Sequence, residues 1–182
     1  MKNRLKIITN IILIFSLSFC TTKTKIENTQ AERKDTQNKL LTLPNCLTLY
    51  NLDTNQSSHE GKTIEIDQSA IIVFINVSCV TCIGDLDFWL ENSRKLQEKN
   101  IPLVYILRAS DDFYFFKFLV ENENKELAPG SYFFDINDEF RKLNEELLLN
   151  ETNTFLINQN LEIITSGNPA KNKSVAHKLF IE

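Results

Sequence analysis

Apolar residues follow two different periods along the chain after residue 40, and the alternation of these periods predicts an α/β protein. Nearly continuous apolar, β-branched runs at 71–77 and 101–107 predict strands that are buried on both faces. Shorter runs, in which apolar and polar residues alternate, predict strands at 46–50, 63–66, 132–134, 154–157 and 161–164. Residues 55–61 are rich in turn formers, and residues 158–160 predict a hairpin between the last two strands.

Helical periodicity occupies the segments between these strands. The helix that follows residue 79 has one apolar side, which consists of Cys82, Ile83, Leu86, Trp89, Leu90, Ser93 and Leu96. Asn100 and Pro102 end this helix, and Ser110 to Asp112 predict an N-cap and an acidic first turn for the next one. Further helical segments are expected at 110–123, 137–149 and 171–180. The order β-β-β-α-β-α-β-α-β-β-α predicts a central mixed sheet with helices on both faces and an N-terminal extension of β-strands.

The first 20 residues resemble an export signal. Residues 1–6 are basic, and the apolar stretch from Ile7 to Phe19 is shorter than the roughly 20 residues that a membrane span needs. The sequence Leu-Ser-Phe-Cys that ends at Cys20 resembles the lipobox of bacterial lipoproteins, which predicts cleavage before Cys20 and its lipidation. The lipobox residue before the cysteine is normally small, so Phe19 leaves an uncleaved anchor as the alternative. Either case predicts a membrane-anchored protein of the bacterial cell envelope that faces the periplasm, where disulfides persist.

Residues 21–40 are polar and predict a flexible tether, so residues 41–182 form the expected folded domain. Residues 1–40 carry a net charge of +5, which leaves −9 for residues 41–182 in a chain whose total is −4. A domain this acidic has no basic surface for nucleic acid, so that class of partner is excluded.

Cys79 and Cys82 lie where a predicted buried strand gives way to a predicted helix. At a helix N-terminus, unpaired N–H groups and the positive end of the helix dipole favour the thiolate of Cys79. Cys82 lies about one turn further on, where it can attack a mixed disulfide formed by Cys79. An isolated C-x-x-C motif also occurs in zinc sites and structural disulfides, but a strand before it and a helix after it are typical of a thioredoxin-like redox motif.

These residues resemble the thioredoxin fold, in particular the TlpA-like and ResA-like thiol–disulfide oxidoreductases of the cell envelope and their redoxin relatives. The resemblance covers residues 43–182 and rests on three segments: 71–82, Phe134-Asp135, and the hairpin at 154–167. It implies that Cys79 and Cys82 are the catalytic residues.

The chain departs from that family at three positions. Ser78 occupies the position of a Trp that usually precedes the first cysteine, and Val73 replaces a buried acid or polar residue that assists proton transfer from the second cysteine. Thr152 aligns with the family's cis-proline. Because cis peptide bonds are essentially confined to proline, we expect a trans bond at Thr152 and an altered surface for the substrate.

Other candidate residues have simpler interpretations. Cys46, on a predicted strand, is expected to be a small buried residue. His59 and His177 lie far apart in sequence, so neither a metal site nor a cofactor is predicted. Asp85 and Asp87 are expected to be solvated acids of the first helical turn, with a proton shuttle as the alternative. The aromatic run from Phe113 to Val120 predicts core packing, with a partner-binding patch as the alternative.

The sequence therefore predicts an envelope-anchored thiol–disulfide oxidoreductase that reduces or isomerises disulfides of exported proteins. Cys79 would attack and Cys82 would resolve the intermediate, with electrons from another protein, because the chain has no glycine-rich nucleotide loop. One alternative is a non-catalytic thioredoxin-like lipoprotein that binds peptides or partner proteins, and the missing proline favours it. A peroxide-reducing redoxin is a weaker alternative, since its site needs an arginine and a Thr-x-x-Cys sequence, and that sequence is absent before Cys79.

Overall fold

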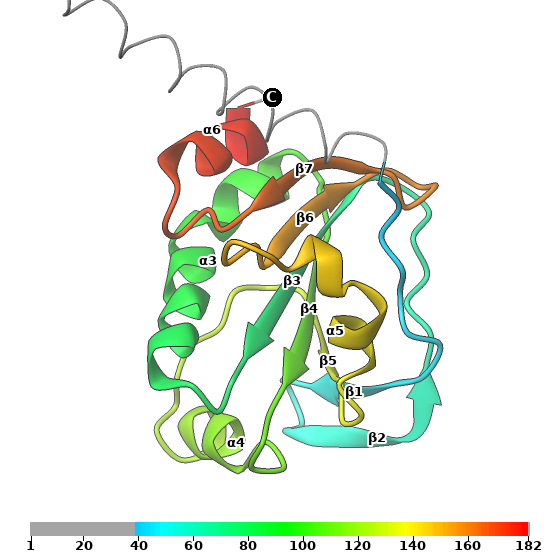
Figure 1. Cartoon of the computed structure of the whole chain (residues 1–182). Helices are drawn as coiled ribbons and strands as arrows, with labels where there is room; N and C mark the ends of the chain where they lie inside the picture. Colours follow the sequence, from blue (N-terminus) through cyan, green and yellow to red (C-terminus); the bar gives the residue numbers. More distant parts are fainter. Residues whose placement is uncertain (1–38, 182) are drawn as a thin grey trace, which may run out of the picture. The chain divides into compact units, whose positions relative to one another are not determined.

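The computed structural model describes residues 39–181, which form a seven-stranded sheet with helices on both faces (Figure 1). The elements follow the predicted order, so the α/β fold class with a central mixed sheet is confirmed. The strands are β1 (Leu47–Asn51), β2 (Gln56–Lys62), β3 (Ala70–Asn76), β4 (Leu103–Arg108), β5 (Ser131–Phe134), β6 (Thr154–Ile157) and β7 (Ile163–Gly167). The helices are α3 (Val80–Glu98), α4 (Tyr114–Glu121), α5 (Glu139–Leu143), the short 3-10 helix η1 (Glu145–Leu147) and α6 (Lys173–Ile181).

The spatial order of the strands is β2-β1-β5-β4-β3-β6-β7. Strands β3, β4 and β5 are parallel neighbours, so their carboxyl ends lie at one edge of the sheet. Strand β6 is antiparallel to β3, with Ala70 opposite Ile157 and Val73 opposite Thr154. The start of β6 therefore lies at the same edge as the carboxyl end of β3, and the segment before β6 reaches the residues that follow β3.

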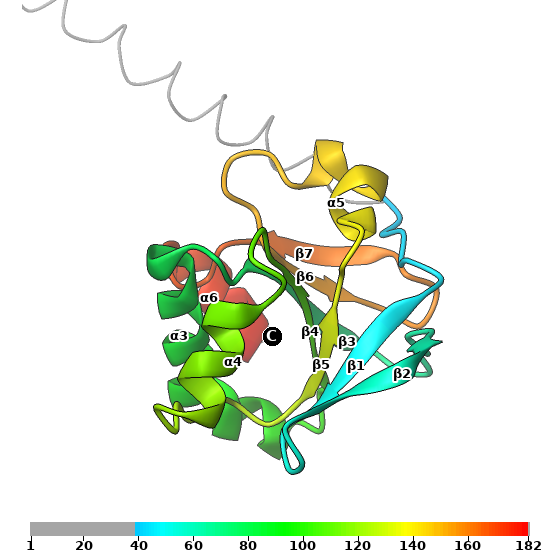
Figure 2. The same ribbon diagram turned by 90° about the horizontal axis from the view of Figure 1, so that it is seen from below.

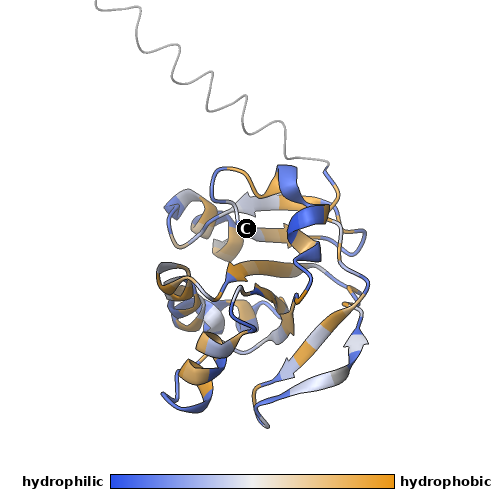
Figure 3. Cartoon of the chain, turned by 60° about the horizontal axis from the view of Figure 1, so that its bottom comes forward, coloured by the Kyte–Doolittle hydropathy of each residue, from blue (hydrophilic) through white to orange (hydrophobic). Residues whose placement is uncertain are grey.

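Two apolar layers cover the sheet. Helices α3, α4 and α6 pack on one face, and α5 packs on the other (Figure 2). Trp89 of α3 and Phe116 of α4 are both about 1% exposed in the first layer, whereas Phe140 of α5 is fully buried in the second. The central strands are correspondingly the most apolar (Figure 3). A buried sheet with packed helices gives the residues at its edges a rigid support.

The first described residues run beside the β6–β7 hairpin. Leu40 forms an isolated bridge with Glu162, and the N–H of Leu41 donates to the carbonyl of Leu161 at 2.9 Å. Cys20, the export signal and the rest of the predicted tether lie outside the described residues, so their predicted roles stay predictions. Within residues 39–181, no helix is both long and apolar enough to span a membrane.

The predicted strand at 63–66 was wrong, because the strand that pairs with β1 is β2 at residues 56–62. Asn51 accepts backbone hydrogen bonds from Asp53 and Thr54, and Asn55 adopts the left-handed conformation at φ 53°, which together close a tight hairpin. Since β2 is an edge strand, it does not need an apolar pattern.

The single helix predicted at 137–149 was also wrong: the structure has α5 and η1 with a break at Asn144. The buried side-chain amide of Asn144 donates to the carbonyls of Phe140 and Thr42, both at 2.8 Å, and its oxygen accepts the N–H of Thr42 at 2.9 Å. This side chain bonds the backbone of a distant segment and thereby interrupts the helix.

Ser110 is not the N-cap of α4, contrary to prediction. The helix begins at Tyr114 after two successive left-handed residues, Asp112 and Phe113, and the carboxylate of Asp111 accepts the N–H of Phe115 at 3.0 Å. Phe113 is held there by stacking on Phe134, with ring centroids 4.0 Å apart. The helix start is therefore fixed by this buried aromatic contact and by Asp111.

Candidate functional site

Cys79 and Cys82 are joined by a disulfide at the start of α3, with their Cα atoms 5.2 Å apart. Cys79 is the N-cap residue in an extended conformation, and its carbonyl accepts the N–H groups of Cys82 and Ile83, each at 3.0 Å. The Sγ atom of Cys79 lies 3.2 Å from the hydroxyl of Thr81. Both cysteines are partly exposed. The structure thus brings the two predicted site residues together at a helix N-terminus, in the arrangement that thiol–disulfide exchange requires.

The residue before the disulfide is anchored to the loop that follows β4. The Ser78 hydroxyl donates to Asp111 at 2.6 Å and accepts the N–H of Ser110 at 2.9 Å. The hydrogen bond from the Ser78 hydroxyl, together with that from the N–H of Phe115, holds the pKa of the Asp111 carboxyl below its usual range. Asp111 therefore places a negative charge beside the segment that carries Cys79. From the sequence, Asp111 was expected only at a helix start, because a contact between two loops that are far apart in sequence leaves no local pattern.

Asp85 is in the second turn of α3 and is partly buried, so the expected solvated first-turn position was wrong. Its Oδ2 atom accepts hydrogen bonds from the side-chain amides of Asn153 at 2.8 Å and Asn168 at 3.3 Å. Burial raises the pKa of the Asp85 carboxyl, although the two amides and nearby Lys171 act in the opposite direction. Asp87, by contrast, is exposed and pairs with Lys125. The sequence did not indicate the roles of Asn153 and Asn168.

Thr152 lies in the segment before β6, which the strand register places beside the carboxyl end of β3. Its N–H donates to the carbonyl of Leu149 at 3.1 Å, and the carbonyl of Asn153 accepts the N–H of Phe74 at 2.7 Å. No cis peptide bond occurs among residues 39–181, in agreement with the trans bond expected at Thr152. Val73 is fully buried in β3 and has no proton to exchange.

Exposed apolar side chains lie at the edge of the sheet that carries the disulfide. Val80, Tyr114 and Ile136 follow the carboxyl ends of β3, β4 and β5, and they are 74%, 73% and 65% exposed. Leu149, in the segment before β6, is 61% exposed. Tyr114 and Phe118 are the exposed members of the aromatic run, while Phe113 and Phe116 are buried as predicted. This edge can contact an apolar polypeptide segment.

The remaining candidates lie elsewhere. Cys46 is a free, exposed thiol just before β1, so its predicted burial was wrong. It falls outside the strand, beside Gly61. His59 belongs to β2 and His177 to α6. In the described part of the chain, no group of three or more His, Cys, Asp or Glu residues is placed to hold a metal ion.

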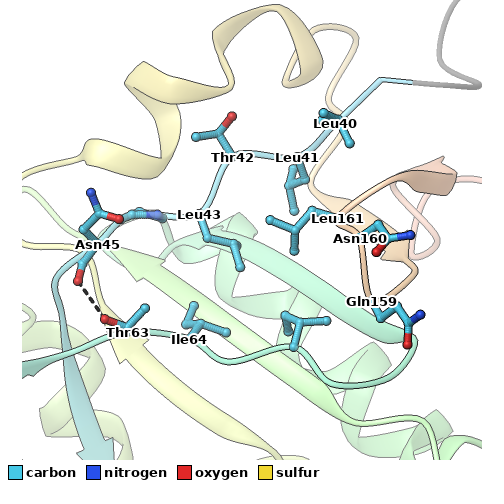
Figure 4. Close-up of a pocket in the computed structure, with 12 residues that line it drawn as sticks. Leu40, Leu41, Thr42, Leu43, Asn45, Thr63, Ile64, Gln159, Asn160 and Leu161 are labelled. Carbon is cyan, nitrogen blue, oxygen red and sulfur yellow. Dashed lines mark hydrogen bonds between the residues drawn. The ribbon is translucent and has the colours of Figure 1, made fainter.

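A pocket of about 480 Å³ lies between the first described residues, the segment after β2 and the β6–β7 turn (Figure 4). Leu41, Leu43, Ile64 and Leu161 contribute its apolar wall, and the Thr63 hydroxyl donates to the carbonyl of Asn45 at 3.1 Å beside it. Because the β6–β7 turn lies next to the amino end of β3, this pocket is at the opposite edge of the sheet from the disulfide. It is separate from the redox site.

The sequence matches no protein-family profile and no curated protein. Solved structures with similar folds include AhpC from Enterococcus faecalis, at a TM-score of 0.55 and 14% identity over 80% of this chain and 93% of that one. The reduced 2-Cys peroxiredoxin of Plasmodium vivax has a TM-score of 0.55 and 14% identity over 79% of this chain and 78% of its own. A candidate thioredoxin from Neisseria meningitidis has a TM-score of 0.50 and 15% identity over 78% and 89%. At these identities the similarity shows the fold.

The chain is a thioredoxin-fold protein, and the expectation of that fold is confirmed. Its C-x-x-C disulfide lies at the start of a helix that follows a buried strand. This combination supports thiol–disulfide oxidoreductase chemistry in general. The fold by itself sets neither the substrate nor the direction of electron flow.

Proposed function

We propose that this protein is an envelope-anchored thiol–disulfide oxidoreductase that reduces or isomerises disulfides of exported proteins. The observation that carries the proposal is the Cys79–Cys82 disulfide at the N-terminus of α3, at an edge with exposed apolar side chains. The helix N-terminus favours the thiolate of Cys79, and the apolar edge suits an unfolded or extended polypeptide.

In the reducing direction, the Cys79 thiolate attacks one sulfur of a substrate disulfide. The other substrate sulfur leaves as a thiolate and takes a proton, and a mixed disulfide remains on Cys79. Cys82 then loses its proton and attacks the Cys79 sulfur, which releases the second substrate thiol and forms the Cys79–Cys82 disulfide. A partner protein with a dithiol supplies two electrons and two protons to restore the reduced form. In the isomerising direction, a substrate thiol attacks the mixed disulfide before Cys82 does.

Reduction of insulin by dithiothreitol tests this proposal, because insulin chains precipitate when their disulfides are cleaved. The full-length chain should accelerate precipitation, and Cys79→Ser should abolish the acceleration. Cys46→Ser is the matched control, since Cys46 is a free, exposed thiol outside the site, and it should retain full activity. A wild-type rate equal to that of dithiothreitol alone would contradict the proposal.

A non-catalytic binding module is the second candidate, and Thr152 favours it. The Thr152 N–H donates to the carbonyl of Leu149, whereas a proline has no N–H to donate. The backbone at this position therefore differs from that of the oxidoreductase family that the sequence resembles. A binding module would retain its disulfide through repeated exposure to substrate and would bind peptides equally well in both redox states. The insulin assay separates this candidate from the first one.

Peroxide reduction has less support from the local geometry. Asn76 occupies the position three residues before Cys79, and its side chain accepts the N–H of Ser78 at 3.2 Å. Arg108, at the end of β4, forms an ion pair with Asp138 at 3.5 Å. A site like that of the peroxide-reducing redoxins would need a threonine in place of Asn76 and an arginine directed at Cys79.

Membrane anchoring is part of the proposal and rests on the order of basic residues, apolar residues and Cys20 in the sequence. Mass spectrometry of the protein from the membrane fraction should find Cys20 as a lipid-modified N-terminus. Cys20→Ala should lose the modification. A mature N-terminus elsewhere, or an unmodified Cys20, would overturn the lipoprotein assignment and leave the redox proposal intact.

A further inference from the structure

We propose that a pocket between α3 and α6 binds a small organic anion with an aromatic body. The two helices lie side by side on one face of the sheet (Figure 2), and the pocket between them has a volume of about 360 Å³. This volume is within the range of small-molecule sites in proteins. Phe88, the lining residue nearest in sequence to the disulfide, is six residues after Cys82, about 9 Å further along the helix. The pocket is therefore a site of its own, beyond the proposed redox function.

Two phenylalanine rings form the apolar wall of the pocket. Phe88 of α3 and Phe180 of α6 are both partly buried, and their ring centroids are 6.0 Å apart at an interplanar angle of 41°. Both rings pack on Trp89, which is about 1% exposed, with centroid distances of 5.4 Å to Phe88 and 6.3 Å to Phe180. Because a buried ring supports them, the two phenylalanines present a fixed surface on which a flat aromatic group can pack.

The polar side of the pocket is positively charged. Lys95 of α3 and Lys173 of α6 line it, and the described residues around it include no acid. The Nζ atom of Lys95 lies 5.4 Å from the ring centroid of Phe180 and donates to the side chain of Asn92 at 3.0 Å, which holds the ammonium group beside the aromatic wall. Neither lysine forms an ion pair with another described residue. The exposed ring of His177 adds a further hydrogen-bonding group to the lining.

These two walls define the chemical class of the ligand. Residues 41–182 carry a net charge of −9, so a pocket lined by lysines without an acid is a local exception that favours an anion. A carboxylate or sulfonate would pair with Lys95 and Lys173, while an aromatic body would pack on Phe88 and Phe180. Exposed ion pairs contribute little individually, so an inorganic anion would gain little there, and an uncharged aromatic molecule would leave the lysines unused.

Titration of the full-length chain with 1-naphthaleneacetate tests the proposal. This probe has an aromatic body and one carboxylate, and 1-naphthaleneacetamide has nearly the same shape without the charge. Trp89 is the only tryptophan in the chain, so its indole N–H gives a single identifiable NMR signal. Because Trp89 packs against both phenylalanines of the wall, the ring current of a bound naphthalene should shift that signal.

We expect a saturable shift of the Trp89 signal, with a dissociation constant of about 0.1–1 mM for the acid, as small ligands of this size allow. The amide should bind about 3- to 10-fold more weakly, a ratio that two exposed ion pairs supply, and the difference should shrink at about 0.5 M salt. The double variant Lys95→Gln, Lys173→Gln should bind both probes as weakly as the wild type binds the amide. The matched control is Arg94→Gln, Lys178→Gln, which removes two cations from the same helices outside the pocket and should keep the preference for the acid.

A variant that fills the pocket tests its position. Ala176 lines the pocket from α6, and Ala176→Leu adds bulk there while both lysines remain, so it should weaken the binding of both probes. Undiminished binding by Ala176→Leu, or no shift of the Trp89 signal up to about 10 mM acid, would overturn the pocket as a binding site.

Equal affinity of the wild type for acid and amide, or a lysine double variant that still prefers the acid, would overturn the assignment of an anion. Thermal unfolding checks that each variant is folded. Should the double variant fail to fold, the comparison of acid and amide on the wild type decides between the same two results. None of these outcomes depends on insulin reduction, so failure of this proposal would leave the proposed redox function in place.

Discussion

The hydroxyl of Ser78 donates a 2.6 Å hydrogen bond to the carboxylate of Asp111, so the residue before Cys79 is bound to an acidic side chain from the loop before α4. The bond joins two loops at the carboxyl edge of the sheet, 33 residues apart in sequence. It gives the site a negative charge on the side of the attacking cysteine. That charge opposes the effect of the helix N-terminus on Cys79.

We therefore predict that Asp111→Asn makes the Cys79–Cys82 disulfide more oxidising. Removal of a nearby negative charge stabilises the Cys79 thiolate and hence the reduced form, which should raise the reduction potential by about 10–30 mV. Equilibration in glutathione buffers followed by thiol trapping measures the potential. Asp112→Asn is the matched control, because Asn tolerates the left-handed conformation found at Asp112 and the substitution removes one charge from the same loop. A potential that is unchanged or lower in Asp111→Asn would contradict the electrostatic role of Asp111.

Asp85→Asn should stabilise the fold at neutral pH. The folded-state pKa of Asp85 is raised, so its contribution to stability is full below the unfolded pKa and is lost as the pH rises through the folded pKa. The variant does not have this loss, so its free energy of unfolding at pH 7 should exceed that of the wild type. The difference should be only about a few tenths of a kcal/mol, because the half-buried carboxyl is partly screened by solvent. Thermal unfolding of wild type and variant from pH 3 to pH 8 should show a difference that vanishes at the acidic end. A variant that is less stable at pH 7 would show that ionised Asp85 stabilises the fold.

Thr152→Pro tests whether it matters that this chain has a threonine where the oxidoreductase family that it resembles has a proline. Proline removes the N–H that bonds to Leu149, and it follows Glu151, whose φ of 61° lies in a region that residues before proline avoid. We expect a loss of about 1–3 kcal/mol in the free energy of unfolding and a higher insulin-reduction rate per folded molecule. Thr152→Ala, which keeps the N–H, is the control. Equal turnover by folded wild type and folded variant would mean that residue 152 does not govern catalysis.

Asn144→Ala should be among the more destabilising single substitutions in this domain. The side chain is 2% exposed, and its removal leaves both the N–H and the carbonyl of Thr42 without their Asn144 partner. A loss of about 2–4 kcal/mol is expected from buried polar groups left unpaired. Urea unfolding measures it, with Asn137→Ala as an exposed control. A loss below about 1 kcal/mol would indicate that water or a local shift replaces these bonds.

The central part of the fold could be predicted from the sequence because its signals are local. The buried strand β3, the apolar side of α3 and the hairpin of β6 and β7 each follow from the spacing of their own apolar residues. The position of Cys79 and Cys82 at a strand-to-helix junction follows in the same way.

The elements that were predicted wrongly depend on contacts with residues that are far away in the sequence. Strand β2 is polar and exists because β1 lies beside it, and the break at Asn144 exists because Thr42 lies opposite. The same applies to the site: Asp111 meets Ser78 and Asn153 meets Asp85 only after the sheet has formed. Sequence periodicity carries no information on such contacts, so these residues could be found only in the structure.

Trapping of the mixed disulfide shows whether Cys79 attacks the substrate and Cys82 resolves the intermediate. Reduced Cys82→Ser, in a full-length chain that also carries Cys20→Ala and Cys46→Ala, would be mixed with oxidised insulin. The products would be separated without reductant and identified by mass spectrometry, and the same two background substitutions would be present in Cys79→Ser and in the chain with both site cysteines. If Cys79 attacks, Cys82→Ser should form a stable adduct linked through Cys79. Cys79→Ser should form none, and neither should the chain with both site cysteines, in which Cys82 releases the substrate. An adduct linked through Cys82 in the Cys79→Ser variant, or no adduct in either variant, would contradict these roles of Cys79 and Cys82.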